Sequence, residues 1–208
     1  MLLNNLPLVQ FIVNIKNPDL SPSREKLLQQ LALYMSEKLK SGKIPQLNFI
    51  CTHNSRRSQF AQVWAFVFGQ YLNLPIEVYS GGTETTAVHP NVINTLKKIG
   101  FEISQDDSSN NPHFTLILDQ LQQLKLWSKT FEDASSPNSD FAAIMVCSDA
   151  DEACPFVPGC ETRIALPFTD PKVSDNTATM EATYLKSSTE IAEQLLFAFK
   201  LATESINQ

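Results

Sequence analysis

The sequence lacks both an excess of positive charge and any long apolar run. Lys and Arg number 16 against 22 Asp and Glu in 208 residues, so the net charge is −6. Nucleic-acid binding usually requires a basic surface field, and we therefore predict no nucleic-acid partner. No stretch reaches the roughly 18 consecutive apolar residues of a membrane helix. We accordingly expect no membrane partner.

The first residues also lack the features of a signal peptide. Residues 1–13 are apolar overall, but no positive region precedes them and four residues interrupt them, namely Asn4, Asn5, Pro7 and Gln10. Secretory signals have a charged start followed by an unbroken apolar segment. We therefore expect a cytoplasmic protein.

Cysteine is scarce as well, with four residues at positions 51, 147, 154 and 160. They are too few and too unevenly placed for a disulfide scaffold. They also lack the short Cys-x2-Cys spacing of common zinc sites, so we predict no metal centre. In a reducing compartment such thiols are reactive groups rather than structural ones, with Cys160 expected to be a spare thiol.

The most informative stretch runs from Cys51 to Ser58. It follows the apolar run 47–50 and precedes a helical pattern, which predicts a strand, a loop and a helix. Backbone N–H groups of a loop at a helix N-terminus, together with the helix dipole, favour a bound anion. The predicted oxyanion-binding residues are Thr52, His53, Asn54, Ser55, Arg56, Arg57 and Ser58. The planar fork of Arg57 can hold two oxygens, and the same field favours a Cys51 thiolate able to attack.

The remaining pattern predicts one α/β unit. Apolar runs predict strands at 47–50, 76–80, 114–118, 141–146 and 163–168, with a further short one at 124–129. Helices between strands imply a parallel sheet covered on both faces, whose ligands bind at the carboxyl ends of the strands. Cys51 and Cys147 each end an apolar run. We therefore expect both thiols at the same edge of the sheet.

An amphipathic helix is predicted over about residues 22–41, with Ser21 as its cap and Gly42 closing it. We predict residues 1–45 to be an N-terminal helical extension and residues 46–208 to be the catalytic domain. The helix carries no evident chemistry. It is expected to serve packing, with a dimer or partner surface as the alternative.

The Cys51-x5-Arg57-Ser58 motif between a strand and a helix resembles the low-molecular-weight protein tyrosine phosphatase superfamily, which includes the thioredoxin-coupled arsenate reductases. The resemblance implies a three-layer fold with a central four-stranded parallel sheet and helices on both faces. It also implies that Cys51 is the nucleophile and Arg57 the oxyanion clamp. Asn54 and Ser58 would organise the loop, and Asp170 of Asp170-Pro171 would be the acid.

Two positions depart from the superfamily pattern. His53 stands where glycine is usual, and Arg56 stands where cysteine is often found. We therefore expect an unusual backbone angle at His53, or a loop that relaxes on anion binding.

The segment from Cys147 to Pro155, Cys-Ser-Asp-Ala-Asp-Glu-Ala-Cys-Pro, closely resembles the redox segment of thioredoxin-coupled arsenate reductases. By this resemblance Cys51 attacks arsenate, Cys147 attacks Cys51 and releases arsenite, and Cys154 attacks Cys147. An external dithiol such as thioredoxin then reduces the resulting disulfide. No bound cofactor is implied. Forming this disulfide requires Cα atoms within roughly 7 Å, so the segment must rearrange.

Two alternatives remain open. The first is a phosphatase for phosphotyrosine or another phosphomonoester with Cys51 as nucleophile, although Lys172 and Val173 follow Asp170-Pro171 where phosphatases place tyrosines. The second is a non-catalytic oxyanion or redox sensor.

Overall fold

The computed structural model describes residues 6–118 and 121–207. Its elements, in chain order, are α1 (Leu6–Val13), α2 (Pro22–Lys40), β1 (Gln46–Cys51), α3 (Arg57–Tyr71), β2 (Glu77–Gly82), α4 (Pro90–Ile99), β3 (Glu102–Gln105), β4 (Phe114–Ile117), β5 (Gln123–Leu126), β6 (Phe141–Met145), α5 (Ser148–Ala153), β7 (Cys160–Ala165), the 3-10 helix η2 (Pro171–Ser174) and α6 (Met180–Ile206).

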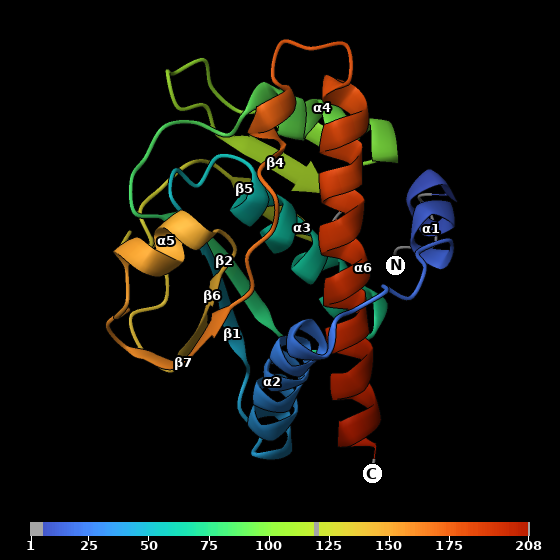
Figure 1. Cartoon of the computed structure of the whole chain (residues 1–208), viewed down its shortest axis with the longest axis vertical. Helices are drawn as coiled ribbons and strands as arrows, with labels where there is room; N and C mark the ends of the chain where they lie inside the picture. The colour runs from blue at the N-terminus through green and yellow to red at the C-terminus, as the bar shows by residue number, and fades with distance from the viewer. Residues whose placement is uncertain (1–5, 119–120, 208) are drawn as a thin grey trace.

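The central sheet has four parallel strands in the order β2-β1-β6-β7. Every residue of β6, and every residue of β1 after Gln46, is buried, so the two middle strands are covered on both faces. Helices pack around this sheet, with α6 running alongside α2 and α3 (Figure 1). The predicted α/β fold with a four-stranded parallel sheet is confirmed.

A second sheet was not predicted as a separate unit. The predicted strands at 114–118 and 124–129 correspond to β4 and β5, which pair antiparallel with each other, and β4 also pairs antiparallel with β3. Parallel pairing needs a crossover of a dozen or more residues. The connections between these three strands are too short for one, which explains why they form a meander of their own.

The predicted amphipathic helix is present as α2. The hydroxyl of Ser21 accepts a hydrogen bond from the Arg24 N–H at 3.3 Å, and Pro22 occupies the first turn. The sequence did not predict α1, whose Phe11 ring stacks on Trp64 of α3 with centroids 5.3 Å apart. Residues 1–5 of the expected extension lie outside the described residues.

The long helix α6 packs against α2, α3 and α4. Its buried residues include Tyr184, Ile191, Leu195 and Phe199, which recur at helical spacing and pack into the core. Within residues 6–118 and 121–207, no helix combines the length and the apolarity needed to cross a membrane.

Candidate active site

The Cys51 loop, residues 51–57, joins the carboxyl end of β1 to the first turn of α3. The carbonyl oxygens of its first five residues, Cys51 to Ser55, each accept a hydrogen bond from outside the loop. In loop order the donors are the N–H of Thr83, the N–H of Glu84, the hydroxyl of Ser128, the side-chain amide of Gln59 and the N–H of His89. Carbonyl oxygens bonded on the outside turn the N–H groups of a loop toward its inside.

Gly82 of β2 allows one of these close approaches. A Cβ at this position would lie 2.6 Å from the Thr52 carbonyl oxygen and 2.8 Å from the Asn54 nitrogen, so any larger residue would push the loop away. The Cys51 loop is therefore shaped from outside by the end of β2 and the segment that follows it.

Asn54 holds the centre of the loop. Its side-chain Nδ2 donates to Ser58 Oγ at 2.8 Å, and its Oδ1 accepts from the Lys129 N–H at 3.0 Å. The Ser58 hydroxyl in turn lies 3.1 Å from Cys51 Sγ. Asn54, Ser58 and Cys51 are all buried. The predicted nucleophile and both predicted loop organisers therefore form one hydrogen-bonded chain.

The unusual backbone angle lies at Asn54, with φ of 46°, and not at His53 where the sequence led us to expect it. Asparagine tolerates the left-handed region because its short polar side chain bonds locally. The His53 ring extends outward instead, and its Nε2 lies 3.5 Å from a carboxylate oxygen of Glu84. No glycine is therefore required at position 53.

Arg57 and Asp170, the predicted clamp and the predicted acid, contact each other. Arg57 Nη2 donates to Asp170 Oδ2 at 2.6 Å, and its Nη1 donates to the Phe168 carbonyl oxygen at 3.1 Å. Asp170 is also the N-cap of η2, because its Oδ1 accepts from the Lys172 N–H at 3.0 Å. The two side chains are 113 residues apart in the chain and meet beside the Cys51 loop.

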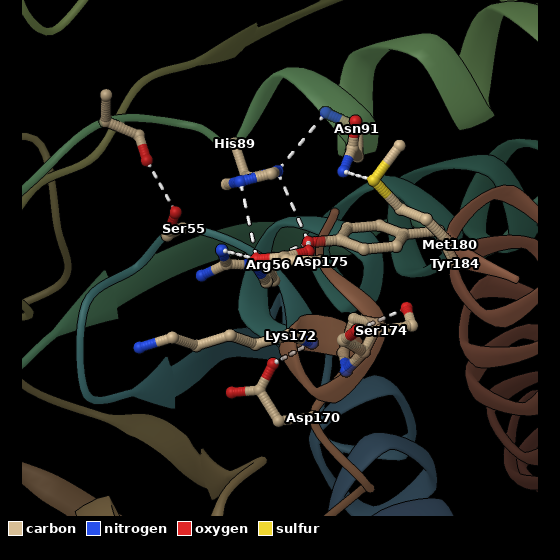
Figure 2. A network of polar contacts seen from close by, with 12 residues as sticks. Ser55, Arg56, His89, Asn91, Asp170, Lys172, Ser174, Asp175, Met180 and Tyr184 are labelled. Atoms are coloured by element: carbon tan, nitrogen blue, oxygen red, sulfur yellow. Dashed lines mark hydrogen bonds and ion pairs between the residues drawn. The ribbon is translucent and has the colours of Figure 1, made fainter. Parts of the chain in front are cut away.

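The side chain of Arg56 is engaged away from the loop interior (Figure 2). Its Nε donates to Tyr184 Oη at 2.6 Å, and its Nη2 donates to Asp175 Oδ2 at 2.7 Å. The Tyr184 hydroxyl donates to Asp175 Oδ1 at 2.7 Å. Two of the three guanidinium nitrogens of Arg56 are therefore engaged outside the loop.

The remaining two predicted thiols lie at the ends of α5. Cys147 follows β6, is buried and caps α5, its Sγ accepting from the Ala150 N–H at 3.3 Å. Val146 N–H bonds to the Ile50 carbonyl oxygen, so Cys51 and Cys147 end neighbouring parallel strands, at the same edge as predicted. Thr52 Oγ1 lies 3.5 Å from Cys147 Sγ.

Cys154 is half-buried at the far end of α5, and all four cysteines are free thiols. Because α5 rises roughly 1.5 Å per residue, the Cα atoms of Cys147 and Cys154 lie about 10 Å apart. Cys160 opens β7, where burial raises the pKa of its thiol and so disfavours the thiolate.

Sequence reasoning missed the residues that surround the loop from far along the chain. Asp175, Tyr184 and Lys129 were assigned no role, and His89 was not expected to take part. Tyr184 is recognisable only as a core residue of α6. The Lys129 ammonium is buried 3.9 Å above the Trp127 ring, and burial lowers its pKa to about 8.

No protein-family model matches this chain. An arsenate reductase of Halalkalibacterium halodurans is 31% identical to it over 129 residues, which cover 62% of this chain and 76% of that protein. The arsenate reductase of Bacillus subtilis is 30% identical over the same shares. Arsenate reductase 2 of Staphylococcus epidermidis is 34% identical over 125 residues, covering 59% of this chain and 76% of that protein. A solved structure described as an arsenate reductase in the phosphate binding state superposes on this chain with a TM-score of 0.47 and 18% identity. The superposition covers 76% of this chain and 98% of that chain.

Proposed function

Because the chain belongs to the arsenate reductase family, within the low-molecular-weight protein tyrosine phosphatase superfamily, we propose that it reduces arsenate to arsenite through a relay of Cys51, Cys147 and Cys154. The observation that carries the proposal is the placement of Cys51 and Cys147 at the ends of adjacent parallel strands, with Thr52 Oγ1 3.5 Å from Cys147 Sγ. A hydrolytic phosphatase needs only the first of these thiols.

In the first step arsenate occupies the Cys51 loop, where inward N–H groups and the Arg57 guanidinium balance its charge. The Cys51 thiolate forms a bond to arsenic, and one arsenate oxygen departs as water after receiving a proton from Asp170. Ser58, which contacts Cys51 Sγ at 3.1 Å, stabilises the thiolate before attack. Arsenic remains in its oxidised state in this adduct.

In the second step the Cys147 thiolate attacks Cys51 Sγ. A disulfide forms between Cys51 and Cys147, the electron pair of the sulfur–arsenic bond passes to arsenic, and arsenite leaves. The Ala150 N–H, which already bonds to Cys147 Sγ, stabilises the negative charge on the attacking sulfur. Two electrons have then moved from two thiols to arsenic.

In the third step the Cys154 thiolate attacks Cys147 Sγ and releases Cys51 as a thiolate. The separation of about 10 Å along α5 exceeds the roughly 7 Å that a disulfide allows, so α5 must unwind. An external dithiol, thioredoxin or a protein of the same chemistry, then reduces the Cys147–Cys154 disulfide. We place this cycle in a reducing cytoplasm, where the thiols are regenerated.

We further propose that residues 46–208 form the catalytic domain and that residues 1–45 are an extension that buttresses it. Arg24 Nε on α2 donates to Gln194 Oε1 on α6 at 2.6 Å, and the Arg24 guanidinium lies 4.5 Å above the Phe168 ring. Phe168 is two residues before Asp170. The extension thus supports the segment that carries the proposed acid.

The test is arsenate-dependent NADPH consumption in the presence of thioredoxin and thioredoxin reductase. We expect multiple turnovers from the wild type and from Cys160→Ser, the matched control for loss of a thiol. Cys147→Ser should stop after one arsenic–thiol adduct, and Cys51→Ser should be inactive. Substantial turnover by Cys51→Ser would refute the nucleophile assignment, and unchanged turnover by Cys147→Ser would refute the relay.

A phosphatase is the second candidate, favoured by the contact of Asp170 with Arg57 beside the loop, which would serve a phosphomonoester equally well. It predicts aryl phosphate hydrolysis that survives Cys147→Ser and Cys154→Ser. Such hydrolysis without arsenate turnover would assign the protein to this class. Binding of arsenate without any turnover would indicate a sensor.

A further inference from the structure

Two consecutive arginines hold the two ends of one short segment. Arg57 pairs with Asp170 at 2.6 Å, and Arg56 pairs with Asp175 at 2.7 Å. Asp170 and Asp175 are the residues that flank η2 on either side. The segment from 170 to 175 is therefore fastened to the start of α3 at both ends, and the proposed acid lies at one of them.

The Arg56 end is a closed triangle of charged and polar groups. Arg56 donates to both Tyr184 and Asp175, and the Tyr184 hydroxyl, having accepted from Arg56, donates to the second oxygen of Asp175. Tyr184 lies on α6 and is fully buried, so the triangle is anchored in the hydrophobic core. Figure 2 shows these groups on one side of η2, with Asp170 on its other side.

His89 closes the outer side of the triangle. Its ring stacks on Tyr184 with centroids 5.6 Å apart, and its Nδ1 accepts from the Asn91 N–H as the cap of α4. The cap leaves the proton of neutral His89 on Nε2, which lies 3.7 Å from Asp175 Oδ2. Burial and the nearby Arg56 charge lower the pKa of His89, so it adds no competing charge at neutral pH.

The triangle also keeps its charge states at neutral pH. Burial and the bond to Asp175 raise the pKa of Tyr184 to about 12, which keeps its hydroxyl as a donor. Burial would raise the pKa of Asp175, but the bonds from Tyr184 and the charge of Arg56 lower it overall. A neutral tyrosine, a carboxylate and a guanidinium therefore coexist.

The segment has little else to fix it on its outer side. Pro171 and Ser174 are buried, whereas Lys172 is exposed and the Val173 side chain is 78% exposed. From these contacts we propose that Tyr184 and Asp175, acting through Arg56, are positioning residues that hold the Asp170 segment against the Cys51 loop. The inference rests on the proposed function for the role of Asp170, but the anchoring itself does not.

The experiment compares Tyr184→Phe and Asp175→Asn with Tyr79→Phe, a control that removes a surface tyrosine hydroxyl bonded only to Glu77. We expect hydrogen exchange of the peptide spanning residues 168–176 to quicken about tenfold in the first two variants, because buried hydrogen bonds are lost. The control should leave this peptide unchanged. Exchange in α2 and β6 should stay unchanged in all three variants.

Activity should separate positioning from general destabilisation. In arsenate turnover, kcat should fall about tenfold, less than the 10²-fold or more expected for removing a general acid. Inorganic phosphate binding by the same variants on a Cys51→Ser background should change less than twofold, because the loop contacts are intact. A loss of phosphate affinity equal to the loss of kcat would overturn the inference, since the triangle would then shape the loop.

Failure of the proposed function would look different. A wild type that turns over no arsenate would refute the reductase, while exchange of residues 168–176 would still decide the anchoring. Unchanged exchange in both Tyr184→Phe and Asp175→Asn would refute the anchoring even if arsenate reduction were demonstrated.

Discussion

The Cys51 loop and the α5 segment carry thiols at the same edge of the sheet, yet they are held in opposite ways. Each carbonyl oxygen from Cys51 to Ser55 is bonded from outside the loop, and Asn54 links the loop to both α3 and Lys129. Asn54, Ser55, Gln59 and Ser128 among these residues are buried. The loop is therefore preorganised, as a site for a developing charge has to be.

The α5 segment depends on far fewer contacts. Arg163 of β7 donates to the carbonyl oxygens of Asp151 and Cys154 and pairs with the Asp151 carboxylate at 2.5 Å. Beyond the helix, the Cys154 thiol donates to the Phe156 carbonyl oxygen at 3.6 Å, and Phe156 is 75% exposed. One arginine thus holds most of the outer end of this segment.

The difference matches two kinds of chemistry. Attack on an oxyanion needs fixed donors around one position, whereas forming a disulfide across α5 needs the helix to open. Segments that open locally have few buried contacts. The comparison therefore predicts that removing the hydrogen bonds that shape the loop costs stability and activity together. Substitutions around α5, outside its two cysteines, should cost little of either.

The largest effect is expected from Asn54→Ala. The substitution leaves the buried Lys129 N–H unpaired, frees Ser58 and forces alanine to a φ of 46°. We expect the free energy of unfolding to fall by about 3 kcal/mol, with about 1 kcal/mol of it from the backbone angle. Chemical denaturation measures the loss, and phosphate binding should weaken in parallel.

The matched control is Asn73→Ala. Asn73 also has a positive φ, of 53°, but it lies on the surface after α3 and away from the loop. Its free energy of unfolding should fall only by the cost of placing alanine at a positive φ. Equal destabilisation by the two variants would mean that the side-chain bonds of Asn54 add nothing, and the contrast between loop and α5 would fail.

A smaller effect of opposite sign is expected from Lys129→Met. The buried ammonium has its pKa lowered to about 8 by burial, from 10.5. Below pH 8 the lysine is charged in both folded and unfolded states, so the full cost of burying the charge is present. Methionine removes this charge and keeps the backbone N–H that donates to Asn54. The variant should therefore be more stable by about 1–2 kcal/mol at pH 7, because loss of the ammonium contact with the Trp127 ring offsets part of the gain.

The stability difference between Lys129→Met and the wild type should depend on pH. Between pH 8 and 10.5 the folded protein releases the Lys129 proton before the unfolded chain does, so the wild type gains stability relative to Lys129→Met. The advantage of the variant should therefore shrink across this window in denaturation curves. If the stability difference stayed constant across this window, burial of the Lys129 charge would not be the cause of the gain in Lys129→Met.

The parts of the site that follow one another in the chain could be predicted from sequence. The strand, loop and helix around Cys51, the thiol at the end of β6 and the helix α2 all depend on local patterns and spacing. The family motif supplied expected roles for Arg57 and Asp170, which meet in the structure. Those roles stay predictions until the variants are measured.

The parts that could not be predicted depend on contacts between distant segments. The sequence predicts that Arg56 binds the oxyanion, but its guanidinium bonds to Asp175 and Tyr184, more than a hundred residues away. The positive φ falls at Asn54 because Lys129 and Ser58 bond its side chain there, which no local pattern shows. The separate sheet of β3, β4 and β5 likewise follows from pairing rather than from the apolar runs themselves.

The smallest effect is expected from Arg163→Met, which acts on α5 alone. It removes the three carbonyl contacts and the Asp151 pair, whose side chains are 24% and 29% exposed, so the loss of stability should be about 0.5–1 kcal/mol. Hydrogen exchange of residues 148–156 should quicken, while the thioredoxin-coupled turnover is retained or rises, because α5 opens more readily. Lys98→Met, which breaks the exposed pair with Glu181, is the control and should change neither. A marked loss of turnover in Arg163→Met would mean that the relay needs α5 held in place, and that the two thiol regions are both preorganised.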